Sequence, residues 1–240
     1  NALLSAVRRQ VTRIAPPERR ADIGTTLGLA ALVLAMYWPA LWFGLQWDDP
    51  EWYLQGYGRS LGDLLLQKNT YQFYRPLAIA LNNLLVSPGG VVNATLAHAI
   101  QVAAHLANTL LVMSLLRRLG AGTSHARIAA LLYAVHPLAY QAVAWSAPQQ
   151  PIATLLTLLS ILLAQEYLQR RQWHWLLLSA SVFACGLLFQ ESVAPAVWVF
   201  VWLAWQDHAR SGKGLSTAWR REAWVLPFAV AVLLYLGAWN

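Results

Sequence analysis

Two adjacent carboxylates, Asp48 and Asp49, directly follow the first long apolar segment of the chain and are flanked by Trp47 and Trp52. Two ionised carboxylates this close repel each other, so such a pair favours the uptake of a proton, and aromatic surroundings strengthen that tendency. The pair suits a general base that removes a proton from a hydroxyl group, or a carboxylate that holds a divalent cation. The simpler alternative is a solvated helix end, with Pro50 completing a turn.

A second candidate is Arg75, which follows Tyr74 beside a short apolar stretch. A guanidinium group can bind a phosphate through two parallel hydrogen bonds at the depth of a lipid headgroup. The alternative is a snorkelling arginine that anchors a helix at the membrane surface. Gln190 and Glu191 lie in a tight turn between two apolar segments. A carboxylate there is costly unless it faces water or a partner.

Histidines provide further candidates. His98, His105 and Asn108 share one face of the second long apolar segment, where interhelical hydrogen bonding explains them at least as well as catalysis does. The single cysteine, Cys185, excludes an intrachain disulfide and adds no metal site. The sequence therefore assigns no metal ligands.

His136 immediately precedes a proline near the outer end of the third apolar segment. One interpretation is that it ends a helix at a kink. The other is that it lines an outward cavity together with the polar and aromatic residues that follow it, Tyr140, Gln141 and Trp145.

The composition requires a membrane environment for all of these residues. Of the 240 residues, 58% are hydrophobic and only 11% are charged, against about 45–50% and about 25% in soluble domains. Thirteen tryptophans fit the same interpretation, because tryptophan favours membrane–water interfaces. These figures exclude a soluble globular domain, a disordered tail and a disulfide scaffold.

The candidate site residues lie within or between segments that are predicted to be apolar helices. A bilayer core of about 30 Å needs about 20 helical residues, and several segments approach that length. The sequence predicts an all-α polytopic membrane protein with about seven transmembrane helices, at Thr25–Gln46, Ala94–Leu116, Ala126–Val143, Pro151–Leu168, Trp173–Phe189, Ser192–Trp205 and Ala223–Trp239.

The long connection between the first two spans, residues 47–93, is predicted to be an outer loop with two helices lying at the interface. One is Ser60–Gln67, which begins with a capping box formed by Ser60 and Asp63. The other is Pro76–Leu85, which is too short to span a bilayer.

Basic residues predict the orientation of these spans. If the N-terminus is cytoplasmic, all 17 lysines and arginines except Arg59, Lys68 and Arg75 lie on the cytoplasmic side, as the positive-inside rule requires. Residues 1–24 then form a cytoplasmic basic segment and residues 25–240 a seven-span module, and we expect a further C-terminal region beyond them. The net charge of +7 indicates contact with anionic lipids and gives no reason to invoke nucleic acid.

Five blocks of sequence, taken in order, resemble the N-terminal half of the GT-C glycosyltransferases, and are most similar to polytopic O-mannosyltransferase-like proteins that carry tetratricopeptide repeats and to their bacterial relatives. The resemblance covers roughly Trp38 to Pro195. The blocks are the acidic pair Asp48-Asp49, the sequence Tyr74-Arg75-Pro76-Leu77, the set His98, His105 and Asn108, the segment from His136-Pro137 to Trp145, and the turn Gln190-Glu191.

This resemblance implies a membrane enzyme of a bacterial cytoplasmic (inner) membrane with its active face outside. Such an enzyme transfers a sugar from a polyprenyl-phosphate carrier to an acceptor, with inversion at the sugar carbon. By resemblance, Asp48 or Asp49 is the base that activates the acceptor hydroxyl and Arg75 binds the carrier phosphate. The remaining matched residues, Tyr74, His136, Gln190 and Glu191, shape the substrate cavity. The carboxylates, Arg75 and Glu191 are then expected to converge on one outward cavity.

Three departures from the family pattern support an alternative. Gln141 replaces the usual glutamate, Gln190 replaces the usual lysine, and the segment Ser146–Pro151 replaces a motif that contains a basic residue. The alternative is a catalytically inactive scaffold or accessory subunit of a larger membrane complex. A transporter is less well supported, because the sequence has no paired half-helices.

Overall fold

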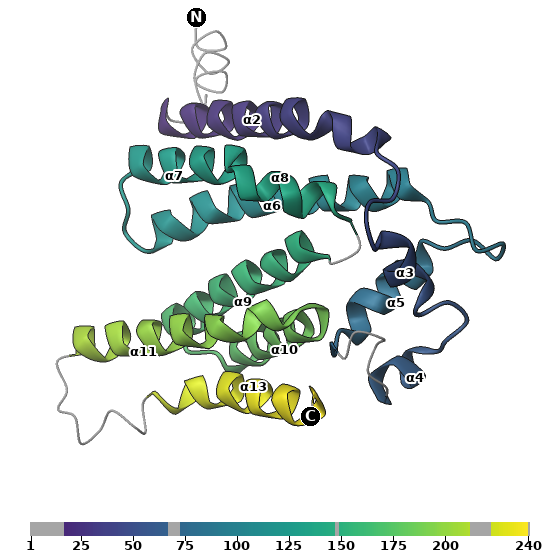
Figure 1. The fold of residues 1–240 in the computed structure, drawn as a ribbon. Coiled ribbons are helices and arrows are strands. Elements are labelled where there is room, and N and C mark those ends of the chain that lie inside the picture. The colour runs from purple at the N-terminus through teal and green to yellow at the C-terminus, as the bar shows by residue number, and fades with distance from the viewer. Residues whose placement is uncertain (1–16, 67–72, 147–148, 212–221, 240) are drawn as a thin grey trace, which may run out of the picture.

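The computed structural model describes residues 17–66, 73–146, 149–211 and 222–239, and within them the chain forms helices joined by loops, with one isolated bridge between Val86 and Val92 (Figure 1). The predicted all-α class is therefore confirmed for this part of the chain. Three helical segments are long and apolar enough to cross a membrane, namely Asp22–Trp42, Ala94–Arg118 and Gln150–Arg170. The predicted number of about seven is only partly confirmed by this criterion.

The first two long segments begin and bend at residues that their chemistry predicts. Helix α2 (Pro17–Tyr37) passes into a 3-10 turn, η1 (Trp38–Trp42), with Pro39 in its first turn. Helix α6 (Ala94–Arg118) is capped by Asn93, whose side chain accepts a hydrogen bond of 3.0 Å from the amide of Leu96. The third is α9 (Gln150–Arg170).

The later predicted spans are shorter or interrupted. The predicted span Ala126–Val143 is interrupted, because the chain forms α7 (Thr123–Val135) and α8 (Pro137–Ala144) with His136 extended between them. Proline has no amide hydrogen and disfavours a helical residue before it, so α7 ends there. The predicted span Ser192–Trp205 likewise begins as a 3-10 turn, η2 (Glu191–Ala196), and becomes α-helical only in α11 (Val197–Ser211).

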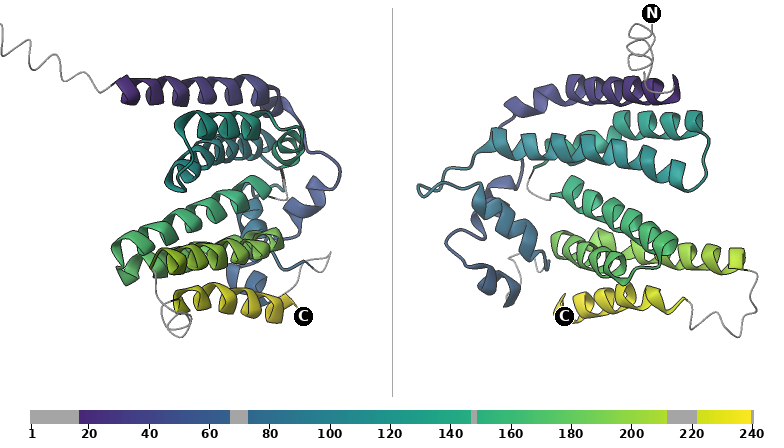
Figure 2. Two further views of the ribbon diagram at one scale, coloured as in Figure 1. Left: turned by 90° about the vertical axis from the view of Figure 1, so that its left-hand side faces the viewer. Right: turned by 180° about the vertical axis from the view of Figure 1, so that it is seen from behind.

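The remaining two predicted spans are Trp173–Phe189 and Ala223–Trp239. Helix α10 (Trp173–Phe189) has the predicted bounds, and the last segment consists of η4 (Ala223–Val225) followed by α13 (Leu226–Trp239). Figures 1 and 2 show that α2, α6, α7 with α8, α9, α10, α11 and α13 lie side by side, each running back along its predecessor. The connection of residues 43–93 lies at one end of this array.

The described part of that connection contains three short helices, α3 (Asp49–Leu54), α4 (Leu61–Leu66) and α5 (Pro76–Leu84). The predicted capping box is present. The Asp63 carboxylate accepts hydrogen bonds from the amide and the hydroxyl of Ser60, and the Ser60 hydroxyl accepts one from the amide of Asp63. Helices of six and nine residues are about 9 and 14 Å long, too short to cross a bilayer. Helix α3 was not predicted as a helix, and Gln67 lies outside the described residues.

Arginine–carboxylate pairs join the helices at the opposite end. Arg117 of α6 and Arg127 of α7 both bind Asp22 of α2, at 2.7 and 3.1 Å. Glu166 of α9 pairs with Arg118 of α6 and, within its own helix, with Arg170, and Arg171 pairs with Asp207 of α11. These contacts hold neighbouring helices together at the end of the molecule where the basic residues gather.

Candidate functional site

The central contact of the site joins Arg75, just before α5, to Glu191, the first residue of η2. Arg75 Nε donates to Glu191 Oε2 at 2.7 Å, and Nη2 donates to Oε1 of the same carboxylate. The guanidinium also lies 4.5 Å from the ring centre of Phe73 and 5.3 Å from that of Trp52. A bidentate ion pair with two aromatic neighbours fixes the orientation of the guanidinium plane.

Asp48 belongs to the same cluster through Trp52. The indole nitrogen of Trp52 donates to Asp48 Oδ2 at 3.0 Å, and the ring of Trp52 contacts Arg75. The other oxygen, Oδ1, is buried and makes no hydrogen bond to the described residues. A buried carboxylate oxygen without a partner is uncommon, so Oδ1 has an unused capacity to accept a hydrogen bond.

Asp49 has a different environment and is fully buried. Its Oδ2 accepts hydrogen bonds from the backbone amide of Gln46 at 2.9 Å and from the hydroxyl of Ser146 at 3.4 Å. The hydroxyl of Tyr53 in turn donates to Ser146 at 3.1 Å, and burial raises the pKa of Tyr53 to about 12. Tyr53 therefore stays protonated at neutral pH and keeps this arrangement intact.

A chain of buried amides continues from Ser146. Gln101 Nε2 donates to the backbone carbonyl of Ser146 at 2.9 Å and to Gln149 Oε1 at 2.6 Å, and Gln149 Nε2 donates to Asn82 Oδ1 at 2.5 Å. All four residues are fully buried. This amide chain links α5, α6 and the start of α9. Sequence reasoning missed it, although Asn82 and Gln101 were detectable as polar residues inside apolar stretches.

Tyr74 and Gln190 flank the central ion pair and are largely buried. The Tyr74 hydroxyl donates to the carbonyl of Leu65, and Tyr235 of α13 donates to the carbonyl of Tyr74 at 3.0 Å. The side-chain oxygen of Gln190 is buried without a hydrogen bond in the described part of the chain. Tyr74 therefore helps to fix Arg75 between the loop and α13.

His136 lies apart from this cluster. It is exposed, and its Nδ1 accepts a hydrogen bond of 3.3 Å from the amide of Leu138, so it caps α8. It lines a cavity of about 310 Å³ with His105, Tyr133 and Pro151. The interpretation of His136 as a residue that ends a helix is confirmed, and the cavity that it lines does not include Tyr140, Gln141 and Trp145, the partners of the alternative interpretation.

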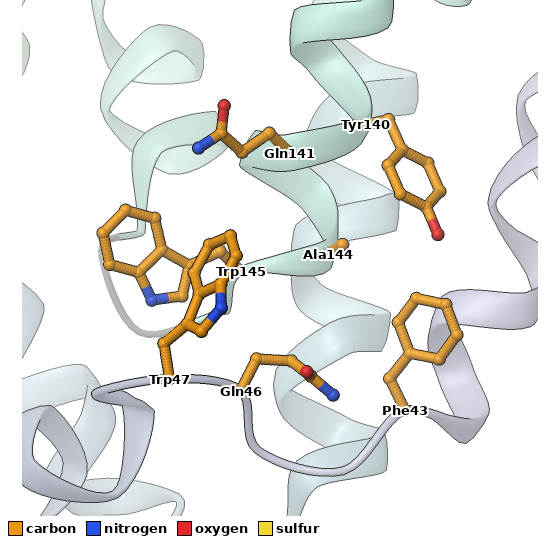
Figure 3. A pocket seen from close by; sticks show the side chains of 7 residues that line it. All are labelled: Phe43, Gln46, Trp47, Tyr140, Gln141, Ala144 and Trp145. Carbon is orange, nitrogen blue, oxygen red and sulfur yellow. The ribbon is translucent and has the colours of Figure 1, made fainter.

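Those three residues line a second cavity, of about 450 Å³, between the loop after η1 and helix α8 (Figure 3). Its lining consists of Phe43, Gln46, Trp47, Tyr140, Gln141, Ala144 and Trp145. Two of its lining residues are next to the carboxylate groups in the chain. Trp47 immediately precedes Asp48, and Trp145 immediately precedes Ser146, which bonds to Asp49.

The polar face of α6 serves helix contacts, as the sequence suggested. His98, His105 and Asn108 are buried and bond to the backbone carbonyls of Gly44, Ala134 and Pro151, respectively. In the described ranges no three histidine, cysteine or carboxylate side chains gather as metal ligands.

A family model described as dolichyl-phosphate-mannose-protein mannosyltransferase matches residues 76–236, which is more than half of the chain. The match begins one residue after Arg75 and includes His136, Gln190 and Glu191. No curated protein matches, and no solved structure matches. Together with the long apolar helices, the match identifies an integral membrane protein.

Proposed function

Since the chain belongs to the dolichyl-phosphate-mannose-protein mannosyltransferase family, a GT-C family of membrane glycosyltransferases, we propose that it transfers a sugar from a polyprenyl-phosphate carrier to an acceptor hydroxyl. The observation that carries this proposal is the cluster in which Trp52 joins Asp48 to Arg75 and Glu191. It offers a carboxylate base and a cation for a phosphate within one set of contacts.

Asp48 is the base in this mechanism. Its unbonded Oδ1 accepts the proton of the acceptor hydroxyl while the acceptor oxygen attacks the anomeric carbon of the donor. The bond between that carbon and the phosphate oxygen breaks, and the polyprenyl phosphate leaves with the electron pair. A single displacement inverts the configuration at the sugar carbon. Asp49 fits this role less well, because it is fully buried and already accepts two hydrogen bonds.

Arg75 stabilises the leaving phosphate. Glu191 engages Nε and one Nη2 hydrogen, so the remaining guanidinium hydrogens can bond a phosphate oxygen. Negative charge on that oxygen grows as the sugar–phosphate bond breaks, and a fixed donor in a partly desolvated site favours this change. Glu191 acts as a positioning residue, because it holds the guanidinium plane between Trp52 and Phe73. Tyr74, Gln190 and His136 are proposed to shape the surroundings of the substrate.

The proposed enzyme crosses the membrane seven times, with the loop of residues 47–93 on the outer side and the N-terminus in the cytoplasm. The distribution of basic residues and the alternating helix directions support this topology. Cysteines placed at the exposed residues Ser87 and Ser124, in a Cys185→Ser background, should react with a membrane-impermeant reagent from opposite sides. Reaction of both from one side would overturn the topology.

Donor dependence tests the proposed activity. The full chain, in vesicles, is supplied with tritiated mannosyl polyprenyl phosphate or with tritiated GDP-mannose, together with a mixture of glycan and Ser/Thr-peptide acceptors. We expect labelled product from the polyprenyl-phosphate sugar only, and we expect Arg75→Gln to reduce it at least 10-fold relative to Arg59→Gln, a change in the same loop. Label transfer from GDP-mannose alone would contradict the proposal.

A second candidate function is that of a catalytically inactive scaffold. It is favoured by the bidentate pairing of Arg75 with Glu191, which neutralises the cation, and by Gln141, which is uncharged where the family pattern has glutamate. On this view the same contacts hold the loop on the helices for a partner protein. Absence of transfer from any polyprenyl-phosphate sugar, together with stable co-purification of a partner, would select the scaffold.

A further inference from the structure

The 450 Å³ cavity beside Trp47 has a lining of unusual chemistry for the surface of a membrane protein. Four of its seven lining residues are aromatic, two are glutamines, and none carries a charge (Figure 3). Its volume lies in the range of about 300–1,000 Å³ that is typical of small-molecule sites. The chemistry of the lining therefore selects an uncharged ligand that can both stack and form hydrogen bonds.

The two tryptophans form the aromatic part of the site. Trp47 and Trp145 lie edge to face with their ring centres 5.5 Å apart, and Trp47 is 74% exposed. An aromatic face carries partial negative charge and attracts the weakly positive C–H groups of a pyranose ring. A pair of rings at a right angle offers such a ligand both a stacking face and a side wall.

Polar groups of the cavity are free to bind a ligand. The carboxamide of Gln141 and the hydroxyl of Tyr140 make no hydrogen bond to the described residues, and both side chains are exposed. A glutamine amide offers both donors and an acceptor, which matches the hydroxyl groups of a sugar. A phosphate would instead require a cation, and the lining has none.

The backbone at Trp47 separates this arrangement from simple membrane anchoring. Its φ is 46°, in the left-handed region that bulky residues rarely adopt. The turn is held by the hydrogen bond from the Gln46 amide to Asp49 and by the 2.8 Å bond from the Asp49 amide to the Gln46 carbonyl. Strained conformations of this kind cluster at ligand sites, whereas an interfacial anchor needs no such backbone.

The position of the cavity identifies which substrate it holds. Asp48 directly follows Trp47, which lines the cavity, and bonds to Trp52, which contacts Arg75. A base for direct displacement must lie between the acceptor hydroxyl and the donor carbon. Arg75 does not line the cavity, so with the donor phosphate at Arg75 the cavity that begins next to Asp48 in the chain is left to the acceptor.

We propose that this cavity binds an uncharged pyranose ring of the acceptor, so that the chain glycosylates a glycan. The assignment to the acceptor rests on the proposed transferase function, whereas sugar binding itself does not. The two are measured separately, because binding needs no donor and no turnover.

Saturation-transfer NMR tests the binding. The full chain, in nanodiscs prepared without glycoside detergent, is mixed with methyl α-mannopyranoside, methyl α-galactopyranoside and methyl N-acetyl-β-glucosaminide. We expect saturation transfer to at least one of them, and at least a fivefold reduction in the Trp47→Ala and Gln141→Ala variants. Trp42→Ala is the matched control, because Trp42 is 72% exposed but does not line the cavity, and it should leave the signal unchanged.

Two results would overturn the proposal. One is the absence of NMR saturation transfer to all three glycosides, with saturation transfer instead to farnesol, a short isoprenoid, or to a Ser/Thr peptide. The other is a glycoside signal that Trp47→Ala and Trp42→Ala reduce equally. If the glycosides bind at this cavity but no polyprenyl-phosphate sugar is consumed, the transferase function fails and the sugar site stands. If sugar is transferred to peptides while no glycoside binds, the transferase function stands and the sugar site fails.

Discussion

Replacing Glu191 with glutamine should destabilise the protein by leaving the Arg75 guanidinium charged and only half bonded. Removing one partner of a buried ion pair costs about 3–5 kcal/mol. Arg75 is 8% exposed but Glu191 is 27% exposed, so water will partly solvate the remaining charge and the lower part of that range applies. The amide oxygen of the glutamine can still accept one of the two guanidinium hydrogen bonds, which retains about 1 kcal/mol. We expect Glu191→Gln to lower the free energy of unfolding by about 2 kcal/mol.

Thermal unfolding in nanodiscs, followed by tryptophan fluorescence, measures this effect. For a chain of this size 1 kcal/mol corresponds to about 2–4 °C, so Tm should fall by about 4–8 °C. The double variant Arg75→Gln/Glu191→Gln should recover part of the loss, because it buries no unpaired charge. Arg170→Gln is the control, since Arg170 is 57% exposed and its ion pair contributes about 1 kcal/mol or less.

The prediction is wrong if the losses of Tm caused by Arg75→Gln and by Glu191→Gln simply add in the double variant. That result would mean that Arg75 and Glu191 do not interact, and the loop of residues 47–93 would then have to be joined to η2 by other contacts. It would also remove the structural basis for treating Glu191 as a positioning residue.

Three further predictions concern the elements that carry the site. Gln101→Leu leaves Gln149 Oε1 and a buried carbonyl without their donor, and should lower Tm by the equivalent of about 2–4 kcal/mol; an unchanged Tm would mean that the amide chain is not formed. Gly56→Ala places a Cβ 2.5 Å from Ile79 Cγ2 and should cost about 1–3 kcal/mol, measured in the same way, and a neutral result would contradict the packing of α3 on α5. Hydrogen bonds from the N-cap serine of α4 hold the pKa of Asp63 below its ordinary value of 3.8, so the stability they contribute is present above pH 3.8 and is lost as the pH falls through the lowered pKa; a carboxyl NMR titration with its midpoint at or above 3.8 would refute this.

Local chemistry predicted the start and end of several helices correctly. Asn93 caps α6 and Ser60 caps α4, because a side-chain oxygen at these positions bonds the free amides of the first turn. A helix end at His136 was also anticipated, because Pro137 follows it. The apolar run continues on both sides of this break, so α7 and α8 were nevertheless counted as one span.

The site was predictable in part for a similar reason. A carboxylate at the membrane edge needs a partner, and Arg75 was the arginine in the predicted outer loop that also belonged to a recognisable sequence block, which made its contact with Glu191 a reasonable expectation. The different environments of Asp48 and Asp49 could not be predicted, because they depend on contacts with Trp52 and Ser146 in the folded chain. No spacing in the sequence connects Asp49 to a residue 97 positions away.

The role of Asp48 tests the account most directly. With a polyprenyl-phosphate sugar in excess, the rate of transfer is measured for the full chain and for Asp48→Asn, alongside Asp63→Asn as a matched change in the same loop. Loss of a general base lowers a rate by about 10²–10⁴-fold, so we expect Asp48→Asn to lose at least 100-fold while donor binding and Tm are retained, and Asp63→Asn to remain active. A rate for Asp48→Asn within threefold of the unmodified chain would contradict the assignment of Asp48 as the base, and with it the proposed mechanism.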